Sequence, residues 1–143
     1  MKGYPKWFTA NLISVVGMVL FFSGLLLMPT VAELRLQLNV PWRMANENRI
    51  VLAGIHVLVG FVVVAIMGAL WSIHMRHEWR KKRNQLTGII LSGALFILII
   101  SGVGIFYFGN ENLTMMSSLT HSAFGVLVFF IYIWHIKART ADR

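Results

Sequence analysis

The chain has 143 residues, of which 57% are hydrophobic and only 13% are charged, whereas about a quarter of the residues in an ordinary soluble domain are charged. It contains no cysteine, which excludes disulfides, iron–sulfur clusters and thioether-attached haem from this chain. Its formal net charge of +8 does not indicate nucleic-acid binding, because the basic residues sort by loop.

Four apolar runs are long enough to cross a bilayer, which takes about 20 residues each. In chain order, we place the four predicted helices near residues 11–28, 50–75, 86–108 and 117–136. The first run follows two lysines, as a signal peptide does, but it is longer than the usual apolar core of about 7–15 residues. We therefore expect a retained helix that ends at Pro29, and a single all-α membrane domain over residues 1–143 built as a bundle of four transmembrane helices.

The basic residues give this bundle an orientation. Ten of the 13 lysines and arginines lie before the first run, between the second and third runs, or after the fourth run. The segment between the first two runs carries the other three, and a linker of about twenty residues is expected there after Pro29. By the positive-inside rule, the N- and C-termini are both predicted to lie in the cytoplasm.

Histidines inside the second and fourth runs are the most informative residues. Ionisable side chains in a bilayer are costly and default to a functional hypothesis. His56 is 18 residues from His74, a spacing that returns to the same face of a continuous α-helix, and His121 is 14 residues from His135, about 40° short of whole turns. Each helix is thus predicted to present two histidines on one face, one near each membrane surface.

Two layers of paired imidazoles suit two haems, each held above and below its iron. We expect His56 with His121 to ligate an outer haem, and His74 with His135 to ligate a cytoplasmic one. Each outer histidine is followed four residues later by a glycine, which clears the helix face beside it for a flat macrocycle. These glycines are Gly60 and Gly125. Basic residues are expected to pair with the haem propionates, namely Arg43 or Arg49 on the outer side and Arg76 or Arg80 on the cytoplasmic side.

Two other interpretations come from different classes. Catalytic zinc needs three protein ligands and an open position, and a cytoplasmic cluster offers such ligands: His74, His77, Glu78 and His135. This interpretation leaves His56 and His121 unexplained. The other alternative is an assembly subunit without a cofactor, in which the glycines serve only helix packing.

The pattern resembles that of the small four-helix membrane b-type cytochromes, the bacterial cytochrome b561 superfamily, which includes the cytochrome subunits of formate dehydrogenases and Ni–Fe hydrogenases. The resemblance covers nearly the whole chain and rests on short motifs: His56-x-x-x-Gly60, His121-Ser-Ala-Phe-Gly125, Ile133-Trp134-His135-Ile136, and Arg83-Asn-Gln-Leu-Thr-Gly88 followed by Ser101-Gly102. The resemblance implies two non-covalent haems b, and a protein that carries electrons between membrane quinone and a partner.

The functional expectation follows from the ligands. Two histidines fill both axial positions of an iron and leave none for oxygen or substrate, so such a haem transfers electrons rather than activating ligands. We expect an electron-transfer subunit of an oxidoreductase complex in the bacterial inner membrane rather than an enzyme on its own. Its expected partners are membrane lipid, quinone or quinol, and a periplasmic redox protein or larger membrane complex, with no nucleic acid.

The orientation is tested by reporter fusions. A reporter active only in the cytoplasm, fused after Arg143, is expected to be active, and a reporter active only in the periplasm is expected to be active within residues 35–49. The uneven distribution of basic residues is the physical reason. The reverse pattern of activity would refute the orientation and exchange the sides of the two haems.

Overall fold

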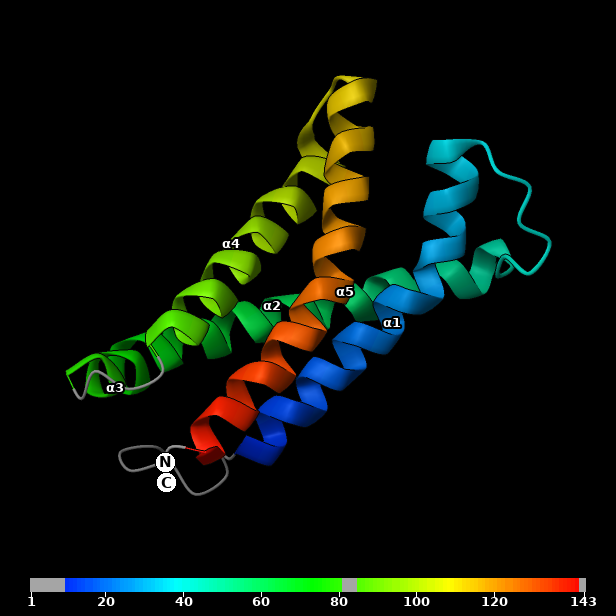
Figure 1. The fold of residues 1–143 in the computed structure, drawn as a ribbon. Coiled ribbons are helices and arrows are strands. Elements are labelled where there is room, and N and C mark those ends of the chain that lie inside the picture. Colours follow the sequence, from blue (N-terminus) through cyan, green and yellow to red (C-terminus); the bar gives the residue numbers. More distant parts are fainter. Residues whose placement is uncertain (1–9, 81–84, 142–143) are drawn as a thin grey trace. The chain divides into compact units, whose positions relative to one another are not determined.

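The computed structural model describes residues 10–80 and 85–141, and within these ranges the chain forms helices, turns and loops but no strand. Four helices are long: α1 (Ala10–Leu36), α2 (Asn46–Leu70), α4 (Gln85–Tyr107) and α5 (Glu111–Ala141) (Figure 1). Each of the four is long and apolar enough to cross a membrane. The prediction of an all-α chain with four apolar helices is therefore confirmed.

The described chain divides into two compact units, and the division falls inside α1 between Leu27 and Met28. One unit holds α2 and the first part of α1, while the other holds the rest of α1 together with α4 and α5. The prediction that Pro29 ends the first helix is wrong, because α1 continues through it to Leu36. Proline removes one backbone hydrogen bond, a loss that apolar membrane helices commonly accommodate.

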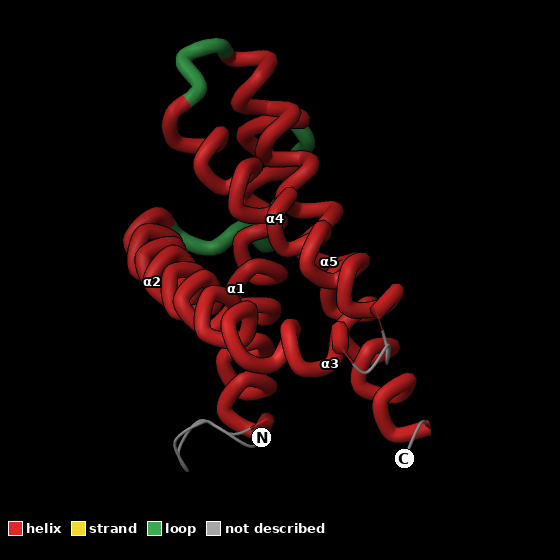
Figure 2. Tube along the Cα trace, turned by 90° about the vertical axis from the view of Figure 1, so that its left-hand side faces the viewer, coloured by secondary structure: helices red, strands yellow, loops and turns green. Residues whose placement is uncertain are grey.

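A short loop of residues 37–45 joins α1 to α2, drawn in green in Figure 2. The helix ends where Gln37 takes a left-handed backbone conformation with a φ of 54°. A salt bridge of 2.8 Å between Arg43 Nε and Glu33 Oε2 ties the loop back to α1. The expected linker of about twenty residues is thus shorter, because its first part is helical.

After α2, the chain passes through a five-residue π-helix, η1 (Trp71–Met75), into the short helix α3 (Arg76–Arg80). The chain thus stays helical up to Arg80, beyond residue 75, where the second helix was predicted to end. The prediction that His74 lies on the same face as His56 assumes one continuous α-helix, and the π-helix shows that this assumption is wrong. A π-bulge adds about one residue to a turn and so rotates the following residues by about 100°.

Helices α4 and α5 form an antiparallel hairpin. The short loop that connects them is yellow and lies at the top of Figure 1. Asn110 caps α5, because its Oδ1 accepts a hydrogen bond of 3.2 Å from the backbone N–H of Leu113. The buried residues of this hairpin are mostly small or hydroxyl-bearing: Thr87, Ala94, Ser101, Gly104, Thr114, Ser117, Ser118 and Ile131. Such residues let helix backbones approach closely, as is typical of membrane helices.

A substitution at Gly104 tests how closely α4 and α5 pack in this hairpin. A Cβ at position 104 would meet the hydroxyl of Ser117 and approach the ring of Phe108 to 2.7 Å. Gly104→Ala is therefore expected to lower the free energy of unfolding by about 1–3 kcal/mol, as overpacking does. Thermal unfolding of the purified protein in detergent measures this loss.

Gly93 provides the matched control on the same helix, since nothing lies within 4 Å of a Cβ built there. Gly93→Ala is expected to leave the unfolding temperature unchanged or slightly raised. Equal behaviour of the two variants would contradict the close packing of α4 on α5 at Gly104.

Candidate functional site

His121 on α5 is held by two acceptors on α4. Its Nδ1 lies 3.0 Å from the backbone oxygen of Leu98 and 3.2 Å from Ser101 Oγ. A carbonyl oxygen only accepts hydrogen bonds, so Nδ1 must carry the hydrogen. Ser101 Oγ donates its own hydrogen to the backbone oxygen of Ile97 at 2.7 Å and therefore accepts from His121. These contacts fix the tautomer, with the lone pair of the neutral ring on Nε2, the nitrogen that a metal would bind.

The imidazole ring of His121 also lies close to a glycine on α4. A Cβ at Gly102 would lie 3.3 Å from Cε1 of His121 and 3.5 Å from its Nδ1. The first of these distances is tighter than ordinary van der Waals contact, so even alanine would push against the imidazole. The absence of a side chain at residue 102 therefore lets the histidine ring lie against the α4 backbone.

His56 on α2 has the same surroundings within its own unit. Its Nδ1 lies 2.8 Å from Ser23 Oγ on α1, and Ser23 Oγ donates to the backbone oxygen of Leu20 at 3.0 Å. The serine hydroxyl hydrogen is thus in use, and the Nδ1–H of His56 is the donor between the two side chains. A Cβ at Gly24 would lie 3.1 Å from Cε1 of His56, so here too a glycine makes room for the ring.

His135 repeats the arrangement at the other end of the α4–α5 hairpin. Its Nδ1 lies 2.9 Å from Thr87 Oγ1, and a Cβ at Gly88 would lie 3.9 Å from its Cε1. Fourteen residues separate Thr87 from Ser101 on α4, and fourteen also separate His121 from His135 on α5. Because the two helices run antiparallel, one register brings both histidines against their partners.

A threonine or serine followed directly by glycine thus faces each of the three histidines, and we call these three dipeptides the hydroxyl–glycine pairs: Ser23-Gly24, Ser101-Gly102 and Thr87-Gly88. The first two are identical Ser-Gly dipeptides in the two halves of the chain, but the sequence gives no reason to place them against histidines. The third pair was not predicted as part of the site. Its signal is the shared spacing of fourteen residues on two neighbouring helices.

The two glycines predicted beside the outer histidines lie in open positions. Among the described residues, nothing lies within 4 Å of a Cβ built on Gly125, and at Gly60 the nearest atom is Leu20 Cδ1 at 4.0 Å. This openness is what a flat macrocycle beside His121 and His56 would need. Their role in binding a cofactor stays a prediction.

The basic residues predicted near the cofactor differ in their surroundings. Arg49 Nε is buried and has no hydrogen-bond partner among the described residues. Arg43 already pairs with Glu33. Arg76 and Arg80 are exposed on α3.

The cytoplasmic zinc alternative depends on side chains outside the described ones. The backbone of η1 and α3 is described, but the side chains of His74, His77 and Glu78 are not. Among the side chains that are described, no group of three or more His, Asp or Glu residues is arranged to hold a metal ion.

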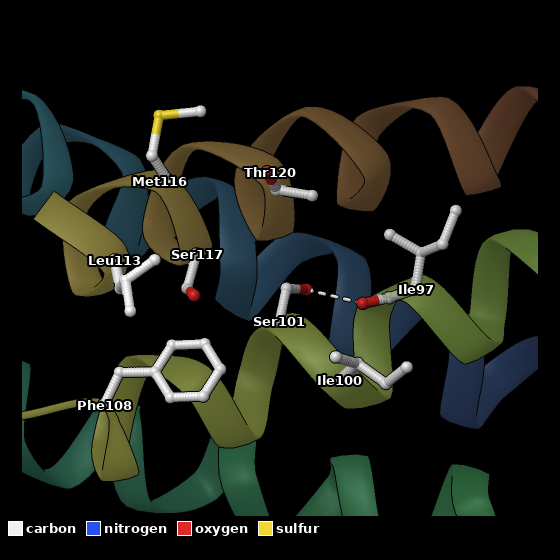
Figure 3. Close-up of a pocket in the computed structure, with 8 residues that line it drawn as sticks. All are labelled: Ile97, Ile100, Ser101, Phe108, Leu113, Met116, Ser117 and Thr120. Atoms are coloured by element: carbon white, nitrogen blue, oxygen red, sulfur yellow. Dashed lines mark hydrogen bonds between the residues drawn. The ribbon is translucent and has the colours of Figure 1, made fainter.

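A shallow groove of about 240 Å³ runs along the α4–α5 hairpin next to Ser101 (Figure 3). Five apolar side chains and three hydroxyls line it: Ile97, Ile100, Phe108, Leu113, Met116, Ser101, Ser117 and Thr120. Ser101 therefore touches both the groove and His121.

Comparison of the chain with models of protein families, with curated proteins and with solved structures finds no match.

The hydroxyl–glycine pairs can be tested at their glycines. Gly24→Val and Gly102→Val are expected to displace the imidazoles of His56 and His121, because even a Cβ would lie 3.1 Å or 3.3 Å from their Cε1 atoms. Overpacking of this kind typically costs about 1–3 kcal/mol. Thermal unfolding in detergent reports this cost.

Gly17→Val and Gly93→Val are the controls on α1 and α4, where a Cβ meets nothing within 4 Å. All four variants carry the same change in helix propensity. If the two pairs of variants lost the same stability, the close approach of the histidines to the glycines would be contradicted.

Proposed function

We propose that this chain is a di-haem b-type membrane cytochrome subunit that relays electrons across the bacterial inner membrane between quinone or quinol and a periplasmic redox partner. The observation that carries the proposal is the repeated environment of His56, His121 and His135. In each, Nδ1 faces a hydroxyl. Metal-ligating histidines almost always donate from the second ring nitrogen to a fixed acceptor, which orients the ring.

The donor set fits haem better than a single ion. A haem iron in an electron-transfer protein takes two axial ligands, and imidazole is a common one. His56, His121 and His135 are each oriented separately, by a hydroxyl on a neighbouring helix. Bound haem would supply a one-electron couple whose potential depends on burial and hydrogen bonding.

The spacing of the histidines along α5 supports two layers of ligands. His121 and His135 lie on one helix, 14 residues and about 21 Å apart along its axis. In the proposal, His56 joins His121 at the outer haem, and the second ligand beside His135 is His74. In the proposal, His121 and His135 each hold one of the two haems between which electrons pass across the bilayer.

The π-helix supports a special role for His74. Single-turn π-helices occur frequently at functional sites, and η1 places His74 inside one. The spacing from His56 to His74 exceeds the spacing from His121 to His135 by four residues. The π-helix changes the backbone phase between the two histidines of this segment from that of a continuous α-helix.

Arg49 is the best candidate for a propionate partner. It lies seven residues before His56 on α2, which is about two turns along the same face, or about 10.5 Å. A buried guanidinium nitrogen that lacks a hydrogen-bond partner is costly. An anionic propionate of the outer haem would satisfy it.

A quinone partner is supported by the chemistry of the groove along α4 and α5. Its walls are mostly apolar, and the hydroxyls of Ser117 and Thr120 lie among them. This combination suits a molecule with a hydrocarbon body and hydrogen-bonding oxygens. Because Ser101 lines the groove and also contacts His121, a quinone held here would lie close to the outer ligand.

The proposed orientation places both termini in the cytoplasm, for the reason of charge given above. The zinc alternative gains no support from the described side chains. The alternative of a cofactor-free assembly subunit does not explain why three histidines share one hydrogen-bonding environment.

The proposal is tested by counting haems. A pyridine haemochrome assay of the purified protein should find about two haems b per chain, by the ligand count. His56→Ala and His121→Ala should each remove one haem, and the same one, because they hold the same iron. His135→Ala should remove the other.

Two further variants address the cytoplasmic ligand. His74→Ala should lose the haem that His135→Ala loses, and His77→Ala should keep both haems. A colourless, folded wild-type protein would end the proposal. Loss of different haems from the His56 and His121 variants would instead show that the pairing is wrong.

A further inference from the structure

We propose that Ser23, Ser101 and Thr87 are positioning residues of the haem sites: their hydroxyls hold the ligand histidines in orientation and set the reduction potentials of the haems. This inference rests on the proposed function. Its starting point is the hydrogen bond that each hydroxyl shares with a histidine Nδ1, of 2.8 Å at Ser23, 3.2 Å at Ser101 and 2.9 Å at Thr87.

The direction of two of these bonds follows from the neighbouring carbonyls. Ser23 and Ser101 each donate their hydroxyl hydrogen to a backbone oxygen of their own helix, one turn earlier. A hydroxyl has a single hydrogen, so each serine must accept from its histidine. The backbone therefore fixes the serine, and the serine fixes the histidine tautomer in which Nδ1 carries the hydrogen and Nε2 the lone pair.

The glycine of each pair fixes the orientation of the ring. Nδ1 and Cε1 are adjacent ring atoms, and at His56 both lie close to the Ser23-Gly24 dipeptide. The hydrogen bond and the glycine contact together turn this edge of the imidazole toward α1. The Nε2–Cδ2 edge then faces away from α1, as a ligand that binds an iron through Nε2 requires. The contacts of His121 with Ser101-Gly102 have the same consequence on α4.

The same hydrogen bonds would also influence the reduction potential of a bound haem iron. Donation from Nδ1–H makes the imidazole a more basic ligand, and a more basic ligand stabilises ferric over ferrous iron. Hydrogen bonding to the axial ligands is one of the levers by which a protein sets a haem potential. Removing the acceptor hydroxyl should therefore move the midpoint potential of that haem to a more positive value.

The backbone oxygen of Leu98 limits the effect at His121, because it accepts from the same Nδ1 at 3.0 Å. Ser101→Ala leaves this second acceptor in place. The shift it produces is therefore expected to keep the tautomer of His121 and to be partial.

The experiment is a redox titration of the purified wild-type protein and its variants, followed by optical spectroscopy, with haem content measured in parallel. Ser23→Ala, Ser101→Ala and Thr87→Val remove the hydroxyls, whereas Ser23→Thr, Ser101→Thr and Thr87→Ser keep them. Ser122→Ala is the matched control, because it lies beside His121 on α5 but its hydroxyl donates to the backbone oxygen of Ser118 at 2.9 Å.

We expect each hydroxyl-deleting variant to shift the potential of one haem to a more positive value. Ser23→Ala and Ser101→Ala should shift the outer haem, and Thr87→Val the other. The hydroxyl-keeping variants and Ser122→Ala should titrate like the wild type. Deletion of the hydroxyl can instead weaken haem binding, by the roughly 10- to 100-fold typical of lost outer-shell partners. In that case the inference is supported if the hydroxyl-keeping variant of the same site binds haem like the wild type.

Two results would overturn the inference while leaving the proposed function intact. One is a set of deletion variants that keep both haems with unchanged potentials. The other is equal loss of haem from the hydroxyl-deleting and hydroxyl-keeping variants of a site, which would mean that the hydroxyl is not what the site requires. Absence of haem from the wild-type protein is a separate result, and it would remove the proposed function itself.

Discussion

The hydrogen bond between a histidine Nδ1 and a hydroxyl on the neighbouring helix is the interaction on which the site depends. An imidazole in an apolar environment must satisfy its polar nitrogens, because an unmet hydrogen bond there is costly. At His56 and His121 a serine meets this need while donating its own hydrogen to the helix backbone. The arrangement is self-contained within each pair of helices, so the ring orientation depends on the protein alone.

The requirement for close approach explains which residues are buried. Among the described residues, the buried side chains other than Ala94 and Ile131 belong to serines and threonines. A glycine follows the hydroxyl residue wherever a histidine ring must fit. Large apolar side chains lie largely on exposed faces, as expected of helices that contact hydrocarbon rather than water. The same few small residues thus provide the helix packing, the hydrogen bonds and the orientation of the histidine rings.

The sequence predicts the helices well, because hydropathy depends on composition over about twenty residues. It fails at Pro29, because a proline that would end a soluble helix is accommodated within α1. The prediction from sequence also fails at residues 71–75, because no simple sequence rule marks a π-turn. The predicted position of His74 on the face of His56 required that segment to be α-helical. The sequence singles out the histidines because ionisable side chains inside a membrane are energetically costly. Their partners Ser23, Ser101 and Thr87 depend on the register between neighbouring helices, and the periodicity along a single helix does not determine that register.

The central claim is that these histidines are axial ligands of haem iron. The most direct measurement is a low-temperature electron paramagnetic resonance spectrum of the oxidised, purified protein. Two histidines on each iron predict low-spin ferric signals from two haems, with one signal lost from the His121→Ala variant. A spectrum without ferric haem, or one dominated by high-spin iron in the wild-type protein, would contradict the account.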